Sequence, residues 1–280
     1  MGEEQVLGVT KLVNMVLGKP AAALLSMLHI DRIHAVNPQY PIPNFIAMEL
    51  VLFLIAAIFF LWLRARISVD RPGGTQQVME MVLTNPMGLG IEDLLEDVVG
   101  HGAERYAPML GTITLFILLA NLLALIPGFM SPTAEKTVPL GCAVIIFVYY
   151  NRTGLGKHGA GPYLKTLLGP FKFFSPYMPI SILMFLVETI SHFARMLSLT
   201  IRLWANMMVS ELIYVTFLGL TVALFGYTSH LNPVGYIAVI APVAIPLALA
   251  LFHVFEAILQ AFIFTILPIV YLGLAVAEEH

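Results

Sequence analysis

The residues best placed to do chemistry lie in a long hydrophobic tract near the C-terminus. Residues 179–225 and 236–277 are mostly apolar, yet seven acidic, basic or histidine side chains and two amides fall within them. An ionisable group near the centre of a bilayer costs about 2.5 to 3.5 kcal/mol on insertion scales, so each such group is a candidate for function. They are Glu188, His192, Arg195, Arg202, Glu211, His253 and Glu256, with the amides Asn206 and Gln260.

Helical spacing places these polar residues on a few faces. In residues 179–225, separations of 4, 3, 7 and 4 residues put five of them in one stripe: Glu188, His192, Arg195, Arg202 and Asn206. Glu211 follows Arg202 by nine residues, about half a turn round the helix. In residues 236–277 the spacing i, i+3, i+7 forms a second stripe of His253, Glu256 and Gln260.

The order of these groups predicts two aqueous vestibules that do not meet. Glu188 precedes Arg202 in the chain and Glu211 follows it. Because carboxylates and imidazoles hold and release protons, we predict that Glu211 and His253 line an outer vestibule. Glu188 and His192 would line an inner one. Arginine stays protonated, so Arg202 would divide the two by holding a carboxylate ionised without relaying protons itself.

Some of these residues have purely structural interpretations that remain open. Glu188, His192 and Arg195 have the spacing of a self-satisfied polar network near the membrane interface. His253 and Glu256 have the spacing of a helical metal site, but a second such pair is absent, so we expect no metal.

The composition predicts a membrane protein. Of 280 residues, 59% are apolar and only 11% are charged, and the mean hydropathy is +0.89, whereas about a quarter of the residues in soluble domains are charged. The single cysteine, Cys142, excludes a disulfide framework and multi-cysteine metal sites. A net charge of −3 argues against nucleic-acid binding. No polar stretch exceeds about 45 residues, too short for a soluble catalytic domain.

We predict an all-α polytopic fold of five membrane spans, after a leader of residues 1–43 on the outer side. The last two apolar segments would extend about 70 and 63 Å as helices, twice the bilayer core. Neither has a polar turn in its middle, so we favour two long tilted helices joined at residues 226–233 over two shorter hairpins. The predicted spans are residues 44–66, 109–130, 136–151, 179–225 and 234–277.

The positive-inside rule supports this count with the N-terminus outside. The inner loops then carry eight lysines and arginines, the outer segments carry four, and the C-terminus is cytoplasmic. In one inner loop, residues 91–99 have apolar side chains at i, i+3, i+4, i+7 and i+8 and acids on the opposite face. That pattern predicts a short amphipathic helix at the membrane surface.

Two runs in the tract resemble a known family. Residues 198–213, SLTIRLWANMMVSELI, contain an Arg-Leu-aromatic-small-Asn-Met pattern followed by Glu-Leu, and residues 260–272 begin QAFIFTIL and end Val-Tyr-Leu. These runs resemble the signatures of subunit a of the F-type ATP synthase. Weaker matches occur at residues 105–108, 121–127 and 132–135, and the resemblance covers residues 44–280 in the same order.

The resemblance implies a non-catalytic stator subunit in the bacterial inner membrane, without a cofactor. Its implied partners are a rotating ring of subunit c, the peripheral-stalk subunit b and the lipid bilayer, and its implied cargo is the proton, with sodium left open. Arg202 would face the ring's membrane carboxylate. The other matches are Glu211 and His253 to the outer half-channel, Glu188 to the inner one, and Gln260 and Asn206 to polar residues near the arginine.

Several residues depart from the family pattern or add to it. His192 and Glu256 are not expected at their positions, and Ala124 stands where some members carry an acid. Glu135 could serve as the entry acid instead, and Asn121 is a further channel candidate. The alternative hypothesis is a stand-alone ion channel or secondary transporter using the same buried charges, although the internal repeat typical of transporters is not visible. Common hydrolase and nucleotide-binding motifs are absent, which argues against an enzyme.

Overall fold

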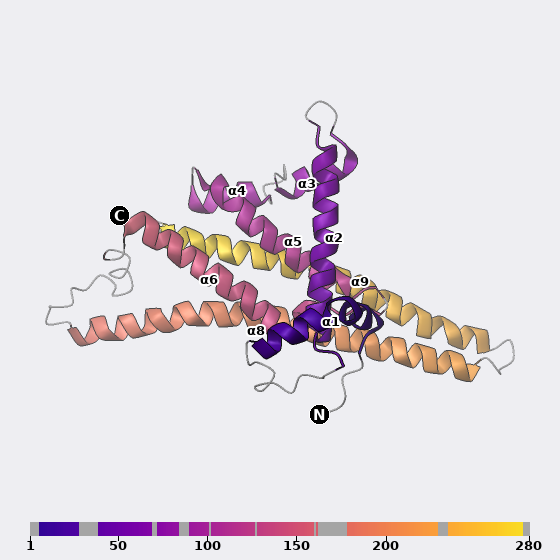
Figure 1. Cartoon of the computed structure of the whole chain (residues 1–280). Coiled ribbons are helices and arrows are strands. Elements are labelled where there is room, and N and C mark those ends of the chain that lie inside the picture. Colours follow the sequence, from indigo (N-terminus) through magenta and orange to yellow (C-terminus); the bar gives the residue numbers. More distant parts are fainter. Residues whose placement is uncertain are drawn as a thin grey trace. The chain divides into compact units, whose positions relative to one another are not determined.

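The computed structural model describes residues 6–27, 39–68, 72–83, 90–100, 102–126, 128–159, 161, 178–228 and 235–276. Within these residues the secondary structure is helical, without a strand (Figure 1). The elements are α1 (Gly8–Met27), α2 (Asn44–Arg66), α3 (Gly74–Leu83), α4 (Ile91–Val99), η2 (Ala103–Tyr106), α5 (Ala107–Leu123), η3 (Pro132–Ala134), α6 (Thr137–His158), α8 (Met178–Thr228) and α9 (Gly235–Val276).

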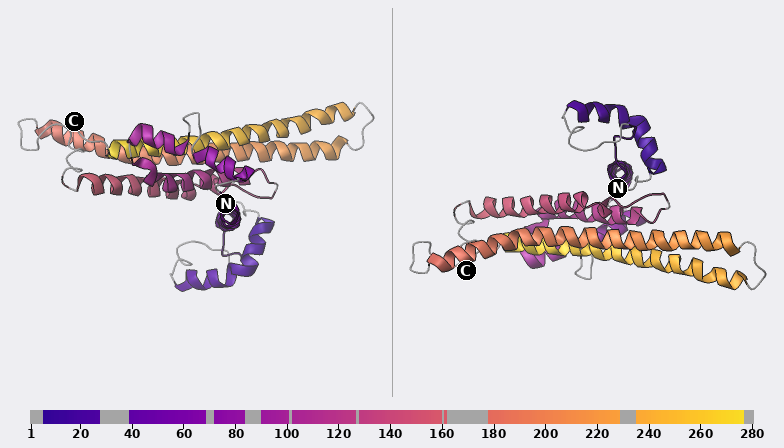
Figure 2. Two further views of the ribbon diagram at one scale, coloured as in Figure 1. Left: turned by 90° about the horizontal axis from the view of Figure 1, so that it is seen from above. Right: turned by 90° about the horizontal axis from the view of Figure 1, so that it is seen from below.

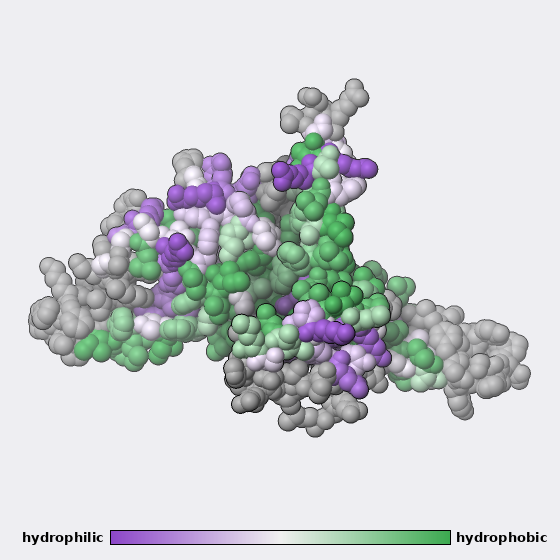
Figure 3. All heavy atoms as spheres, in the orientation of Figure 1, coloured by the Kyte–Doolittle hydropathy of each residue, from purple (hydrophilic) through white to green (hydrophobic). Residues whose placement is uncertain are grey.

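Five helical segments are long and apolar enough to cross a membrane. They are Asn44–Arg66, Ala103–Leu123, Thr137–His158, Ile182–Ala223 and Ala244–Val276. Hydrophobic side chains cover the length of α2 (Figure 3), and large ones such as Phe53 are 74% exposed. An apolar surface this exposed is what a lipid environment requires. The predicted all-α polytopic fold is therefore confirmed.

The last two helices are as long as the sequence predicts. α8 contains 51 residues and α9 contains 42, each without a break. Pro242, Pro246 and Pro268 lie inside α9 without ending it. Proline is tolerated in membrane helices, where neighbouring groups satisfy the freed carbonyls. Of the predicted connection at 226–233, residues 226–228 belong to α8 and the rest lies outside the described residues.

Other helix ends differ from the predicted spans because hydropathy does not decide where a helix stops. α6 continues past the apolar run to His158 and ends at Gly159, which has a φ of 80° and donates its N–H to the carbonyl of Leu155. α5 ends at Leu123, before the apolar run does. The N–H of Leu125 bonds to the carbonyl three residues earlier, which tightens the last turn.

The chain divides into two compact units, each described by itself. The first comprises Met1–Arg66, Leu118–Glu135 and Asn206–Ile258. In it, α1 lies across the N-terminal end of α2, and the later part of α8 runs beside the earlier part of α9 (Figures 1 and 2). Buried Asn14 of α1 accepts a hydrogen bond from the Ile42 N–H at 3.0 Å and donates one to the Ile42 carbonyl at 2.9 Å. This amide therefore ties α1 to the segment that enters α2.

The second unit comprises Ile67–Ile117, Lys136–Ala205 and Leu259–His280. The predicted amphipathic helix is α4, and it buries Ile91 and Leu95 while Glu96 and Asp97 are exposed. The C-terminal end of α9 comes very close to α4. A β-carbon added at Gly273 would lie 2.7 Å from Cγ1 of Val98 and 3.1 Å from the Val98 carbonyl oxygen. Only glycine allows this approach without a shift of Val98.

We expect Gly273→Ala to destabilise the chain by about 1 to 3 kcal/mol, the usual cost of overpacking. The measurement is the midpoint of thermal unfolding in detergent, which should fall. Gly141→Ala is the matched control, because position 141 is also helical and has nothing within 4 Å of an added β-carbon. That control should unfold at or above the original midpoint. Equal midpoints for the two variants would contradict the close approach of α9 to α4.

Candidate functional site

The first unit holds a buried histidine that is hydrogen-bonded through both ring nitrogens. His253 of α9 is 2% exposed. Its Nδ1 lies 2.7 Å from the hydroxyl of Ser210 on α8, and its Nε2 lies 3.1 Å from the backbone carbonyl of Asn121 on α5. A partner on each nitrogen fixes both the position and the rotation of the imidazole. The polar group around it, here named the His253 cluster, consists of Asn121, Ser131, Thr133, Ser210, Glu211 and His253.

The turn after α5 supplies the hydroxyls of the His253 cluster. Gly128 has a φ of 89°, which glycine adopts without strain. The chain then folds back so that the Ser131 hydroxyl donates to the Ala120 carbonyl at 3.1 Å and lies 2.7 Å from the Thr133 hydroxyl. Thr133 in turn donates to the side-chain oxygen of Asn121. Ser131, Thr133 and Asn121 are fully buried, and the Asn121 side-chain nitrogen has no partner among the described residues.

Glu211 borders the same cluster. It is half-buried and follows Ser210 in α8, and the backbone N–H of Ser131 faces its carboxylate. Its Oε2 atom is enclosed and has no hydrogen-bond partner among the residues the structure describes. Glu211 and His253, predicted to share a vestibule, thus lie in one cluster but are connected through Ser131, Thr133 and Asn121. The connection runs through the Ser131 backbone N–H and the Asn121 amide and carbonyl, which do not relay protons, so it holds the two side chains in one polar group without passing a proton between them.

Two further acids of the first unit lie outside these hydrogen bonds. Glu256 is half-buried on α9, and its Oε2 has no partner within the described part of the chain. Glu135 is half-buried and follows η3, where its N–H bonds to the Pro132 carbonyl at 3.1 Å. Neither carboxylate contributes a hydrogen bond to the His253 cluster.

The second unit holds the other polar group, named here the Glu188 cluster. The Glu188 carboxylate lies 3.6 Å from His192 Nε2 and 3.6 Å from the Arg195 guanidinium. These are the contacts that the sequence spacing predicts. The hydroxyl of Tyr150 on α6 lies 3.2 Å from His192 Nδ1, and the Tyr150 ring stacks on the imidazole. All three α8 side chains keep some exposure, so water can reach the cluster.

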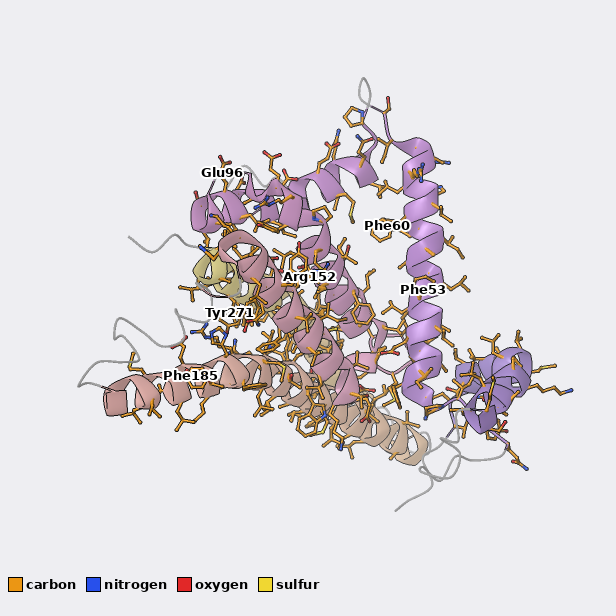
Figure 4. The ribbon with its side chains drawn as sticks, turned by 60° about the vertical axis from the view of Figure 1, so that its left-hand side comes forward. Phe53, Phe60, Glu96, Arg152, Phe185 and Tyr271 are labelled. Carbon is orange, nitrogen blue, oxygen red and sulfur yellow. The ribbon has the colours of Figure 1, made fainter. Side chains whose placement is uncertain are left out.

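Tyr271 of α9 completes the Glu188 cluster. Its ring lies 5.5 Å from the Arg195 guanidinium and 6.1 Å from the ring of Tyr150. Figure 4 shows Tyr271 among the side chains of α6 and α8. The positive charge of Arg195 is therefore compensated twice, by a carboxylate and by an aromatic face.

Arg202 has no such compensation. Its side chain is half-buried on α8, between the buried residues Leu199 and Leu203, and it makes no hydrogen bond or ion pair with any described residue. Gln260 of the same unit is 2% exposed, and its side-chain oxygen also lacks a described partner. Asn206 of the first unit is half-buried. A half-buried guanidinium without an ion-pair partner among the described residues is a group that an added anion would stabilise.

Within the described residues no group of three or more histidines, cysteines or acids could hold a metal ion. The sequence family described as ATP synthase A chain matches residues 46–273, which include every candidate residue named above. The chain belongs to this family. It is accordingly a multi-pass membrane protein of ATP synthesis and proton transport.

Bacterial members of the ATP synthase family match over most of their length. ATP synthase subunit a of Koribacter versatilis (strain Ellin345) is 36% identical over 271 residues, 97% of each chain. The subunit of Solibacter usitatus (strain Ellin6076) is 39% identical over 240 residues, 86% of this chain and 90% of the relative. That of Geotalea uraniireducens (strain Rf4) is 34% identical over 209 residues, 75% and 77% of the two chains.

Reasoning from the sequence missed five residues of the two clusters. They are Ser131, Thr133, Tyr150, Ser210 and Tyr271. Serine, threonine and tyrosine carry no charge, so they do not stand out against an apolar tract as the acids and arginines do. The available signals were position and motif: Ser210 precedes Glu211, Thr133 lies within the weak match at 132–135, and Tyr271 lies within the match at 260–272.

Proposed function

We propose that this chain is the proton-translocating stator subunit of an F-type ATP synthase membrane sector. Two half-channels deliver protons to, and remove them from, the membrane carboxylate of a subunit c ring. The His253 cluster lies on the outer half-channel, the Glu188 cluster lies on the inner one, and Arg202 separates them. The subunit performs no ATP chemistry and couples the proton motive force to rotation.

The observation that carries this proposal is the uncompensated charge of Arg202. Along α8 it follows Glu188 by 14 residues and precedes Glu211 by nine, and each of those acids belongs to its own polar cluster. A ring carboxylate would supply the missing anion. In a low-dielectric site the guanidinium favours the ionised carboxylate, so the approach of each ring subunit to Arg202 drives release of its proton.

The same charge also prevents protons from bypassing rotation. Arginine stays protonated under physiological conditions, so Arg202 passes no proton between the two clusters. A proton entering on the outer side must neutralise a ring carboxylate and travel round with it before it leaves. Each proton that crosses 100 mV supplies about 2.3 kcal/mol, and several are needed for each ATP.

The remaining assignments follow from charge and from the family. The excess of lysine and arginine in the predicted inner loops supports an N-terminus outside and a C-terminus in the cytoplasm. The bacterial relatives point to the inner membrane of a bacterium, with the subunit b peripheral stalk as the second protein partner. A stand-alone channel or transporter is the competing hypothesis, and it differs by conducting ions without a ring.

Glu211→Gln tests the outer half-channel. Glutamine preserves the size and burial of the side chain but cannot take up a proton, so proton-driven ATP synthesis should fall at least about tenfold. The rate is measured in vesicles that carry the assembled enzyme under an imposed proton gradient. Glu256→Gln is the matched control, since Glu256 is also half-buried and has an enclosed oxygen, but contributes no bond to the His253 cluster. We expect a smaller loss for that control. An unchanged rate in Glu211→Gln would remove this acid from the pathway.

A further inference from the structure

The two partners of His253 define the protonation of its ring. Nε2 lies 3.1 Å from the Asn121 backbone carbonyl, and a carbonyl oxygen only accepts hydrogen bonds. Nε2 must therefore carry a proton. In the neutral imidazole, Nδ1 is then the nitrogen with the free lone pair. The Ser210 hydroxyl, 2.7 Å away, donates to that lone pair.

We propose that Ser210 is a positioning residue that holds Nδ1 of His253 as the nitrogen that receives the transported proton. This inference rests on the proposed function of the His253 cluster, and it assigns a role to a residue that carries no charge. The donor is on α8 and the ring is on α9, so one hydrogen bond fixes the histidine of one helix relative to the neighbouring helix. Ser210 also places Nδ1 on the side of the ring that faces the α8 segment bearing Glu211.

A hydroxyl suits this position because it can reverse its role without moving its oxygen. While the ring is neutral, Ser210 donates to Nδ1. When a proton reaches the serine oxygen, the hydroxyl passes its own hydrogen to Nδ1 and keeps the incoming one, so one O–H bond breaks as another forms. The ring becomes an imidazolium with a donor on each nitrogen, and the serine oxygen accepts from Nδ1. The other proton stays on Nε2 throughout, donated to the Asn121 carbonyl. When the proton leaves Nδ1, the original pattern returns, so each cycle moves one proton and breaks no other covalent bond.

Because His253 is buried, loss of its hydrogen bond to Ser210 should affect proton uptake. His253 is 2% exposed, so water from bulk cannot readily replace a lost partner. Without the hydroxyl, Nδ1 would be a buried acceptor lacking a donor, and its protonated form would lack an acceptor. Hydrogen bonds to charged groups are stronger than those between neutral groups, so the imidazolium loses more than the neutral ring does. Proton uptake should therefore slow.

The first test leaves Ser210 unchanged. The assembled membrane sector, prepared with 15N-labelled histidine, is studied by solid-state NMR, with His253→Gln used to assign the His253 signals. We expect the neutral ring to show a protonated Nε2 and an unprotonated, hydrogen-bonded Nδ1. A neutral ring protonated on Nδ1 would overturn the proposal, whatever the variants do.

The second test uses the Ser210 hydroxyl. In the assembled enzyme, Ser210→Ala should slow proton-driven ATP synthesis about tenfold and move the Nδ1 signal to that of a nitrogen without a donor. Ser210→Thr keeps the hydroxyl and should restore most of the rate and the original signal. Thr216→Ala is the control, because that hydroxyl is also on α8 but bonds only within its own helix, to the Leu212 carbonyl.

The outcomes separate this inference from the proposed function. If His253→Gln slows synthesis while Ser210→Ala retains both the rate and the Nδ1 signal, the role of Ser210 is wrong and the half-channel stands. If His253→Gln itself leaves synthesis unchanged, the half-channel assignment fails, and with it the reason for a positioned Nδ1.

Discussion

Replacing Arg202 with alanine is expected to reduce proton-driven ATP synthesis by the assembled enzyme below detection. In the proposed function, the variant loses the charge that would hold the ring carboxylate ionised and keep the two half-channels apart. Removing one partner of a buried ion pair costs about 3 to 5 kcal/mol, a factor of about 10² to 10⁴ in rate if the cost falls on the translocation step. ATP hydrolysis by the detached catalytic sector should be unaffected, because the proposed function gives this chain no part in it. Both rates are measured on the same preparation.

Two further variants show whether the loss of ATP synthesis depends on the position of Arg202 or follows from the removal of any arginine from α8. Arg195→Ala removes another arginine from α8, but its partners Glu188 and Tyr271 belong to this chain, and Glu188 retains His192. We expect this control to keep a measurable part of the synthesis rate. Arg202→Lys keeps the charge but loses the fixed planar fork of guanidinium donors, so it should be severely impaired as well. Coupled synthesis that persists undiminished in Arg202→Ala would contradict the proposed function.

The helices of this chain follow largely from its apolar runs. A run of about 20 apolar residues has few alternatives to a membrane helix, because every backbone polar group must be satisfied within the segment. That rule predicts α2 to within its ends, and the absence of a polar turn predicts α8 and α9 as single long helices. The helical period of the apolar residues in 91–99 predicts α4, because it gathers them into one stripe that must be buried.

What hydropathy cannot predict is where the backbone changes direction. α6 extends seven residues past its predicted end at 151, through a segment that is mostly polar and includes Gly154 and Gly156. α5 stops at Leu123 although the next three residues are apolar. Both ends depend on local hydrogen bonds and on glycines with positive φ, which do not change the hydropathy of the segment.

The candidate site was predictable where spacing on one helix suffices. Glu188, His192 and Arg195 are four and three residues apart on α8, and the structure places them in contact. Contacts between elements distant in sequence were not predictable in this way. Nothing local indicates that the turn carrying Ser131 and Thr133 folds against Asn121, or that Ser210 meets His253 across 43 residues. Those contacts depend on how the elements pack against one another.

The uncompensated Arg202 also shows how a site can be incomplete within one chain. The sequence singles out Arg202 because a charged side chain is energetically unfavourable in a membrane. The structure adds that Arg202 forms no ion pair with a described residue. Arg195, seven residues earlier on the same helix, has both a carboxylate and an aromatic ring as partners. The contrast between the two arginines is the reason to expect an acid from a partner subunit at one position and not at the other.

The most direct test of this account is the dependence of proton flux on the ring. Liposomes containing an internal pH-sensitive dye carry the purified chain alone, the subunit c ring alone, or the membrane sector assembled from the chain, the ring and subunit b. A potassium diffusion potential drives proton entry, and the amount of chain incorporated is matched between preparations. We predict rapid acidification with the assembled sector, and acidification at the rate of empty liposomes with the chain alone or the ring alone. Equally rapid acidification with the chain alone would contradict the account and would identify a stand-alone channel.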